Sequence, residues 1–304
     1  MHADQPPPIV FFHRGYDPYI AFALQQARVT NPQSPVYLLG DETNDLSHLG
    51  VTHVPYRNYP GRSKEFIAAY QHFSCHELAC ERLCFERHFH LADFVQRERI
   101  GPFLYLDSDV LLLVNLRPLL PTWRQYDIAG TPGMWCSCYY GEPALTSAFC
   151  DFMLERYRDP GQLEAWRRQY GVQRLDVSNP GINDMVLSGM FLERSGLRHL
   201  HLEQPRDRLV FNTSFLRSEH EHIPIARGPD GRIYALIDGR SVQLGSLHLI
   251  GSSKRWASAF VDWSGALVRC FLKPNYRRNF KKLIKHYYFG RRFKRGIPLA
   301  PAPK

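Results

Sequence analysis

The feature that most constrains this chain is an apolar run, Phe103 to Val114, that contains two aspartates, Asp107 and Asp109. A run of this composition is typical of a buried strand in a parallel sheet. An ionised carboxylate in an apolar setting is costly unless it is paired or bound to a metal. Residues i and i+2 of an extended strand point to the same side, so both carboxylates should converge at the strand end. The pair predicts a Mg²⁺ or Mn²⁺ site, the alternative being a loop start in which Asp107 acts as a cap.

The segments around this run predict an α/β fold with a Rossmann-like sheet that is mixed but mainly parallel. A strand at 9–13, an amphipathic helix at 19–29 and a strand at 36–39 form a βαβ unit. Further strands are expected at 51–54, 126–130 and 242–248, and helices at 63–98, at 143–170 and after the loop that begins at Val177. Such a sheet binds nucleotides at the carboxyl ends of its strands. The sequence lacks the Gly-x-Gly-x-x-Gly fingerprint, which argues against an NAD enzyme.

The size and composition of the chain suit one large α/β domain or two small ones. With 304 residues, of which 44% are apolar, the chain can build a sizeable core, and bulk disorder is excluded. No apolar run reaches the roughly 18 to 20 residues of a membrane span, and the polar start at 1–8 is expected to be flexible rather than a signal peptide. The seven cysteines, an odd number, suggest free thiols. We therefore expect a cytoplasmic protein.

The net charge of +9 is concentrated at the C-terminal end. Residues 273–304 hold eleven Lys or Arg and no Asp or Glu, so the remaining chain has 38 − 11 = 27 basic against 29 acidic residues. A basic, aromatic tail at 263–304 predicts an anchor on an anionic membrane surface, here the inner face of the membrane. Nucleic-acid binding and a solvated terminus are the alternatives. We favour the membrane and expect no nucleic acid, because the body is slightly acidic and has no nucleic-acid module.

A second motif, His-x-x-Gly-x-x-Lys, follows the last expected strand. His248 can complete a metal site through a ring nitrogen, and Gly251 allows the backbone to approach a phosphate closely. Lys254 supplies a positive charge for that phosphate. Taken alone, the histidine could be a satisfied strand-end residue and the lysine a solvated surface residue. Together with the upstream aspartates, they predict a clamp for a metal and a diphosphate.

The ordered pair of motifs resembles the glycosyltransferases of the GT-A fold, and most closely family 8, which includes glycogenin and the bacterial lipopolysaccharide galactosyltransferases. The resemblance covers roughly residues 8 to 256, and it implies a GT-A domain at 9–262 between the flexible start and the tail. It implies a UDP-sugar donor such as UDP-glucose or UDP-galactose, Mn²⁺ or Mg²⁺, and usually retention of configuration. The acceptor would be a glycan or lipid-linked glycan in cell-surface polysaccharide or lipopolysaccharide synthesis.

The resemblance also implies roles for single residues of the two motifs. Asp107, Asp109 and His248 would be the metal ligands, and the glycine and lysine of the second motif would hold the diphosphate. Ser108 and Asp109 would face the donor ribose and sugar.

Outside the two motifs, the resemblance implies two further groups of donor contacts. The loop after the first strand would hold the base, which makes His13, Gly15 and Tyr16 candidates. A basic residue on the helix before the metal strand would lie near the donor, and Arg87 is our choice with Arg82 in reserve.

The chain departs from the family pattern at two places. Arg255 stands where the family usually has proline, and Asn183-Asp184 stands where it often has Asp-Gln. Asp184 is a catalytic candidate beside Asp109: it could bind the donor sugar or the acceptor, or act as the general base of an inverting enzyme. In a retaining enzyme the UDP oxygen could take the acceptor proton. The pair could equally be a plain helix N-cap.

Three other interpretations compete with the transferase. The Cys- and His-rich stretch at 72–88, with a second ligand pair such as Cys136 and Cys138, could bind zinc, although packing of small apolar thiols fits it better. The chain could be a catalytically silent GT-A module that binds glycans or partners, although intact ligand residues argue against this. It could also be a basic-tailed nucleic-acid binder.

Overall fold

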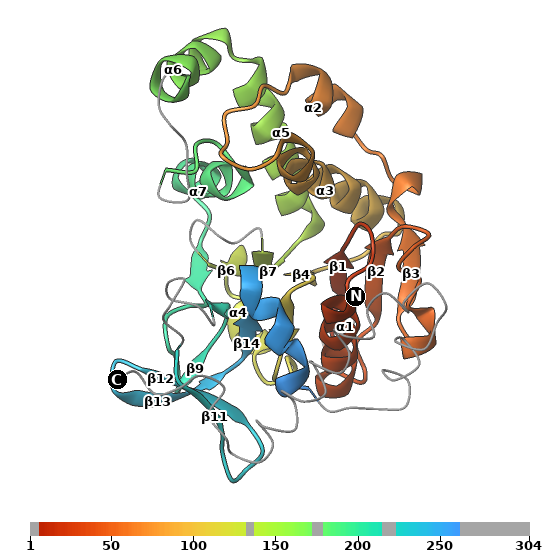
Figure 1. Ribbon diagram of the computed structural model, residues 1–304, viewed down its shortest axis with the longest axis vertical. Helices are drawn as coiled ribbons and strands as arrows, with labels where there is room; N and C mark the ends of the chain where they lie inside the picture. Colours follow the sequence, from red (N-terminus) through yellow and green to blue (C-terminus); the bar gives the residue numbers. More distant parts are fainter. Residues whose placement is uncertain (1–5, 132–136, 172–178, 215–222, 262–304) are drawn as a thin grey trace. The chain divides into compact units, whose positions relative to one another are not determined.

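The computed structural model describes residues 6–131, 137–171, 179–214 and 223–261 of the chain (Figure 1). These residues form two compact units, which we describe separately. The first unit comprises Met1–Val54, Leu106–Thr122 and His201–Lys304, and the second comprises Pro55–Tyr105 and Trp123–Leu200. The predicted tail at 263–304 and residues 1–5 of the predicted flexible start lie outside the described residues.

The first unit opens with the βαβ arrangement that the hydrophobic pattern predicts. Strands β1 (Ile9–Phe12) and β2 (Val36–Gly40) are parallel, with Ile9 opposite Val36, and helix α1 (Pro18–Thr30) connects them. All four residues of β1 are buried, and α1 buries its apolar face while proline begins it, where the missing N–H costs no helical bond. The predicted βαβ unit is confirmed.

The central sheet has seven strands in the order β3-β2-β1-β4-β7-β6-β8. The strands not yet given are β3 (Thr52–Pro55), β4 (Phe103–Asp107), β6 (Ile128–Gly130), β7 (Cys138–Gly141) and β8 (His199–His201). β6 and β7 are antiparallel, and the chain passes from the second unit to the first within β4. The predicted α/β fold with a mixed, mainly parallel central sheet is confirmed.

The apolar run from Phe103 to Val114 is not one strand. β4 ends at Asp107, a turn follows at Ser108 and Asp109, and β5 (Val110–Leu112) joins a different sheet of the order β10-β14-β5. Burial on both sides of the turn gives the run its continuous apolar character, so hydrophobicity alone does not reveal the break.

The strand expected at 242–248 is also divided. β13 (Arg240–Leu244) and β14 (Ser246–His248) belong to different sheets, with Gly245 between them. A Cβ on Gly245 would lie 2.5 Å from Cζ of Phe211, so only glycine allows the ring to pack against the backbone there.

The remaining strands and 3-10 helices of the first unit were not predicted. They are β9 (Leu209–Val210), β10 (Thr213–Ser214), β11 (Ile225–Arg227), β12 (Ile233–Ile237), η1 (Ser47–Leu49) and η4 (Gly251–Ala259). The four strands β11-β12-β13-β9 form a separate sheet.

The second unit is mainly helical. Its helices are η2 (Tyr56–Asn58), α2 (Ser63–Ala69), α3 (Leu78–Arg97), α4 (Leu120–Trp123), which begins within the first unit, α5 (Pro143–Arg158), α6 (Pro160–Tyr170) and α7 (Asp184–Ser195). The helical patterns at 63–98 and 143–170 therefore each contain two helices. The second pattern breaks at Asp159, which caps α6 by accepting a hydrogen bond from the Gly161 N–H at 2.8 Å.

An aromatic cluster holds α2, α3 and α5 together. The ring of Phe66 lies 5.1 Å from that of Phe89 and 5.1 Å from that of Tyr157, and all three side chains are buried. Contacts of this kind favour tilted and edge-on rings and fix the helices relative to one another. Among the helices that the structure describes, none is long and apolar enough to cross a bilayer.

Candidate functional site

Strand pairing in the first unit brings the two sequence motifs together. β14 runs antiparallel to β5, which places His248 opposite Val110, and the Leu249 N–H donates to the carbonyl of Asp109 at 2.9 Å. The histidine at the end of β14 therefore lies beside the turn that carries Asp109. This pairing joins segments about 140 residues apart in the chain, which no local pattern predicts.

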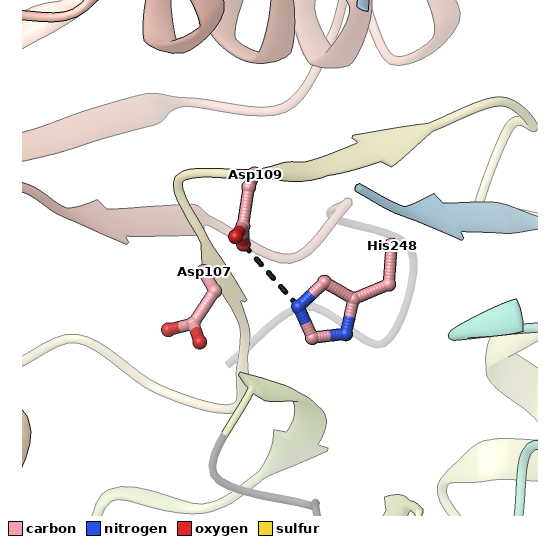
Figure 2. Close-up of side chains that lie close together, drawn as sticks. All are labelled: Asp107, Asp109 and His248. Carbon is pink, nitrogen blue, oxygen red and sulfur yellow. Dashed lines mark ion pairs between the residues drawn. The ribbon is translucent and has the colours of Figure 1, made fainter. Parts of the chain in front are cut away.

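Asp107, Asp109 and His248 form one group of candidate metal ligands (Figure 2). One ligand atom from each residue lies within 4.8 Å of the others, and Nε2 of His248 lies 3.3 Å from Oδ1 of Asp109. The predicted convergence of the two carboxylates is confirmed, but its cause is different. The turn at Ser108 and Asp109 produces it, because the strand has ended before the second aspartate.

Lys254 is the fourth charged residue of this group. It lies in the first turns of η4, and its Nζ is 3.0 Å from Oδ2 of Asp109 and 4.8 Å from the centre of the Tyr19 ring. Gly251 begins the same helix with a φ of +56°, a backbone conformation that favours glycine. A Cβ there would meet nothing within 4 Å, so the space next to this backbone position is open.

Opposite charges in this group favour the ionised form of each partner. Burial raises the pKa of Asp109, but hydrogen bonds and charges from His248 and Lys254 outweigh it and hold that pKa well below its usual range. Burial lowers the pKa of His248, and the carboxylates of Asp109 and Asp107 reverse this and raise it. The pKa of Lys254 is likewise raised, since Asp109 outweighs its burial.

The donor atoms of the group fit a divalent cation. Two carboxylates and an imidazole suit Mn²⁺, and the carboxylates suit Mg²⁺. With bonds of about 2.1 Å, opposite ligands of an octahedral ion lie about 4.2 Å apart. The spread of up to 4.8 Å among the ligand atoms of Asp107, Asp109 and His248 is close to that separation.

The loop after β1 is held in one conformation by polar contacts. Nδ1 of His13 and Oγ of Ser108 lie 2.9 Å apart, and the Gly15 N–H donates to Oδ2 of Asp41 at 2.6 Å. Nδ2 of Asn44 donates to the carbonyls of His13 and Gly15 at 2.8 and 2.7 Å. Burial and then the charge of Lys254 lower the pKa of His13 to about 4, so its ring is neutral at pH 7.

Asp41 and Asn44 were missed by sequence reasoning, although they hold this loop. Their signal was the Asp-Glu-Thr-Asn sequence directly after β2, since the carboxyl ends of neighbouring parallel strands meet at one edge of a sheet. Tyr16, the third predicted residue of the loop, is half-buried next to Gly15.

The second unit brings together the two remaining predicted residues. Nη2 of Arg87 on α3 lies 2.6 Å from Oδ2 of Asp184, the first residue of α7, and Nε2 of His88 lies 3.5 Å from the same oxygen. Burial raises the pKa of Asp184, but the charge of Arg87 and the hydrogen bond from His88 lower it to about 2. The reserve candidate, Arg82, pairs instead with Glu86 at 3.5 Å.

The N-cap interpretation of Asn183-Asp184 is confirmed, and it applies to Asn183. Asn183 is the N-cap of α7, and its Oδ1 accepts a hydrogen bond from the Val186 N–H at 2.8 Å. Asp184 turns its side chain to the arginine of α3. The cap is a local feature of the sequence, whereas the ion pair depends on the packing of α3 against α7.

Zinc binding by the Cys- and His-rich stretch finds no support in the described part of the chain, where the Asp107 group alone has the spacing of metal ligands. Cys80 is exposed and Cys84 half-buried on α3. Cys136 lies outside the described residues.

No family model matches the chain, and no curated protein matches its sequence. Its backbone is similar to those of solved structures that include the following three. Mouse xyloside xylosyltransferase 1 is 10% identical with a TM-score of 0.46, covering 67% of this chain and 87% of that one. The bifunctional glycosyltransferase WbbM is 10% identical with a TM-score of 0.43, and the match covers 93% of this chain and 52% of WbbM. Glycosyltransferase GlyE of Streptococcus pneumoniae is 13% identical with a TM-score of 0.41, and the match covers 99% of this chain and 66% of GlyE.

Proposed function

We propose that this chain is a metal-dependent glycosyltransferase of the GT-A type that transfers a hexose from a UDP-sugar, such as UDP-glucose or UDP-galactose. The observation that supports this most strongly is the group of Asp107, Asp109 and His248, with Lys254 bound to the same aspartate. Two acidic oxygens, an imidazole and a lysine can hold a divalent ion and a diphosphate together.

In this proposal Asp107, Asp109 and His248 would hold Mn²⁺ or Mg²⁺, which stabilises the negative charge that develops on the departing UDP. Lys254 contacts a diphosphate oxygen, and the positive φ of Gly251 keeps the neighbouring backbone open to it. Ser108, fixed by His13, faces the ribose. The neutral His13, Gly15 and Tyr16 hold the nucleobase.

Arg87 and Asp184 bind the donor sugar in this proposal. A general base works best when its pKa lies near the working pH, and a carboxylate with a pKa of about 2 is a poor one. We therefore assign Asp184 to accepting hydrogen bonds from sugar hydroxyls. This role agrees with a retaining reaction, in which an oxygen of the departing UDP takes the acceptor proton.

We further propose a glycan or lipid-linked glycan as acceptor, in the synthesis of cell-surface polysaccharide or lipopolysaccharide. The basic tail at 263–304 would hold the enzyme on the anionic inner face of the membrane from the cytoplasm, which its charge favours.

Titration calorimetry with UDP, in the presence and absence of Mn²⁺, tests the proposed site. We expect the wild type to bind UDP with Mn²⁺ at least tenfold more tightly than without, and Asp109→Asn to lose this difference. Asp45→Asn, an exposed aspartate of the same unit, is the matched control and should behave as the wild type. Hydrolysis of a panel of UDP-sugars then identifies the donor. Absence of binding to UDP, GDP and CMP would exclude the transferase.

A further inference from the structure

A buried glutamate of α3 contacts the start of α7. Glu81 is 1% exposed, and Oγ of Ser74 donates to its Oε2 at 2.8 Å. The N–H of Asp184 also donates to this carboxyl group. Within the described residues Oε1 of Glu81 has no hydrogen-bond partner. A buried carboxylate with one unpaired oxygen is costly when ionised, because nothing replaces the water it has lost.

The segments that meet at Glu81 are fixed by backbone pairing. Ser74 and Gly181 form an antiparallel bridge, the Ile182 N–H donates to the Phe73 carbonyl at 2.8 Å, and the Cys75 N–H donates to the Pro180 carbonyl at 3.0 Å. The chain thus reaches the first turn of α7 directly from this pairing. Glu81 is the side chain that joins the pairing, through Ser74, to the backbone of Asp184.

The groups around Glu81 disfavour its negative charge. Burial and then the carboxylate of Asp184 raise the pKa of Glu81 to about 7. The groups that face it are Asp184, the thiols of Cys80 and Cys84, and the phenols of Tyr70 and Tyr157. The cations that act on these surrounding groups are Arg82, which pairs with Glu86, and Arg87, which pairs with Asp184. An ionised Glu81 would therefore lie beside an ionised Asp184, and the hydrogen bonds from Ser74 and the Asp184 N–H offset this repulsion only in part.

We propose that Glu81 is a positioning residue whose protonated side chain holds the first turn of α7, and that its ionisation displaces Asp184 from Arg87. The proposal rests on the function proposed above, in which Asp184 binds the donor sugar. Under this proposal the rate of sugar transfer depends on pH near neutrality. The enzyme with protonated Glu81, which predominates at lower pH, is the active form. Asp184 itself stays ionised throughout this range, so the change belongs to Glu81.

Hydrogen–deuterium exchange of residues 183–188 tests this without a substrate. In a pH series spanning about 1.5 units on either side of pH 7, corrected for intrinsic rates, protection of this segment in the wild type should fall as pH rises. Glu81→Gln mimics the protonated form and should keep its protection at all pH values. Glu86→Gln, the same charge change on the same helix, should follow the wild type. Protection independent of pH in the wild type overturns the proposal.

The pH profile of donor hydrolysis gives the second readout. Wild-type kcat/KM should fall through one ionisation with a midpoint near pH 7 and about tenfold per unit above it, and Glu81→Gln should abolish this step. Ser74→Ala removes a hydrogen bond to the ionised form, so its midpoint should move to higher pH. A midpoint unchanged in Glu81→Gln contradicts the proposal. If no UDP-sugar is hydrolysed, the proposed transferase function is contradicted instead. Hydrogen–deuterium exchange by itself then tests the role of Glu81.

Discussion

At the scale of single residues, Asp109 is held between two nitrogen groups. Its Oδ1 faces Nε2 of His248 and its Oδ2 faces Nζ of Lys254, at 3.3 and 3.0 Å. These contacts favour the ionised form of the carboxylate and hold it in place. The same contacts explain why Lys254 is positioned although its side chain is about one-third exposed.

Replacement of Lys254 should weaken nucleotide binding specifically. We expect Lys254→Met to raise the Kd for UDP with Mn²⁺ by about tenfold or more, because a charge-assisted hydrogen bond to a phosphate contributes roughly 1.5 to 3 kcal/mol. Uridine, which has no phosphate, should bind both proteins equally. Arg255→Met removes an exposed charge from the next residue and is the control. Equal loss in both variants would indicate a general electrostatic effect.

The buried Arg87–Asp184 pair should stabilise the fold in a pH-dependent manner. The pKa of Asp184 is lowered to about 2, so its contribution is complete above its unfolded pKa and is lost as pH falls through the folded value. We expect Asp184→Asn to lower the free energy of unfolding by about 2 kcal/mol or more at pH 7, since it also leaves Arg87 unpaired.

Urea unfolding of wild type and Asp184→Asn between about pH 7 and pH 2 measures this effect. The difference between the two proteins should narrow as pH falls below about 4. Asp151→Asn, which removes an exposed partner of Arg62, should cost at most about 0.5 kcal/mol. A pH-independent difference for Asp184→Asn would show that its cost is steric rather than electrostatic.

At the scale of elements, the site depends on where strands end. β4 stops at Asp107, and β14 starts after Gly245, so both motifs lie at the junction of strand and loop. The carbonyl of Gly245 accepts a bond from the Leu113 N–H at 2.8 Å, which connects this junction to the segment after β5. The break at the glycine thus sets the register that brings His248 to the aspartates.

Substitution of this glycine should disturb the site through the fold. A Cβ at Gly245 would lie 2.5 Å from the Phe211 ring, so we expect Gly245→Ala to cost about 1 to 3 kcal/mol in urea unfolding. The same change should weaken Mn²⁺-dependent UDP binding. Phe211→Leu combined with Gly245→Ala should recover part of the stability. If the double variant loses as much stability as the two single variants together, the ring is excluded as the cause.

At the scale of the whole molecule, the candidate residues are divided between two units. The ligand group and Lys254 belong to the first, and the Arg87–Asp184 pair with Glu81 belongs to the second. The ion pairs described for each group join residues of the same unit. Variants of one group can therefore be compared with variants of the other to separate the proposed roles in nucleotide binding and in sugar binding.

The charge of the whole chain predicts a salt-sensitive surface partner. We expect the protein to sediment with phosphatidylserine vesicles and not with neutral phosphatidylcholine vesicles, and to be released by salt, because each basic residue near the surface contributes about 1 kcal/mol. Changing Lys281, Lys282 and Lys285 to Glu should abolish sedimentation and leave UDP binding unchanged. Sedimentation equal to the wild type would exclude the tail as an anchor.

The sequence by itself determined the candidate ligand residues of this protein and part of its local structure. Carboxylates in an apolar run, a histidine and a lysine at fixed spacing, and the periods of the first strands and helices are properties of neighbouring residues. They were sufficient to predict the βαβ unit and the identity of the candidate ligands. The helix N-cap at Asn183 is local in the same sense.

Only the tertiary structure decided which of these residues meet. Long-range pairing of β5 with β14 places His248 at Asp109, and packing of α3 against α7 selects Arg87 over Arg82. Buried Glu81 carries no sequence signal, because its unusual environment is made by segments up to about 100 residues away. Charge interactions depend on distance and burial in space, and these are set by the whole fold.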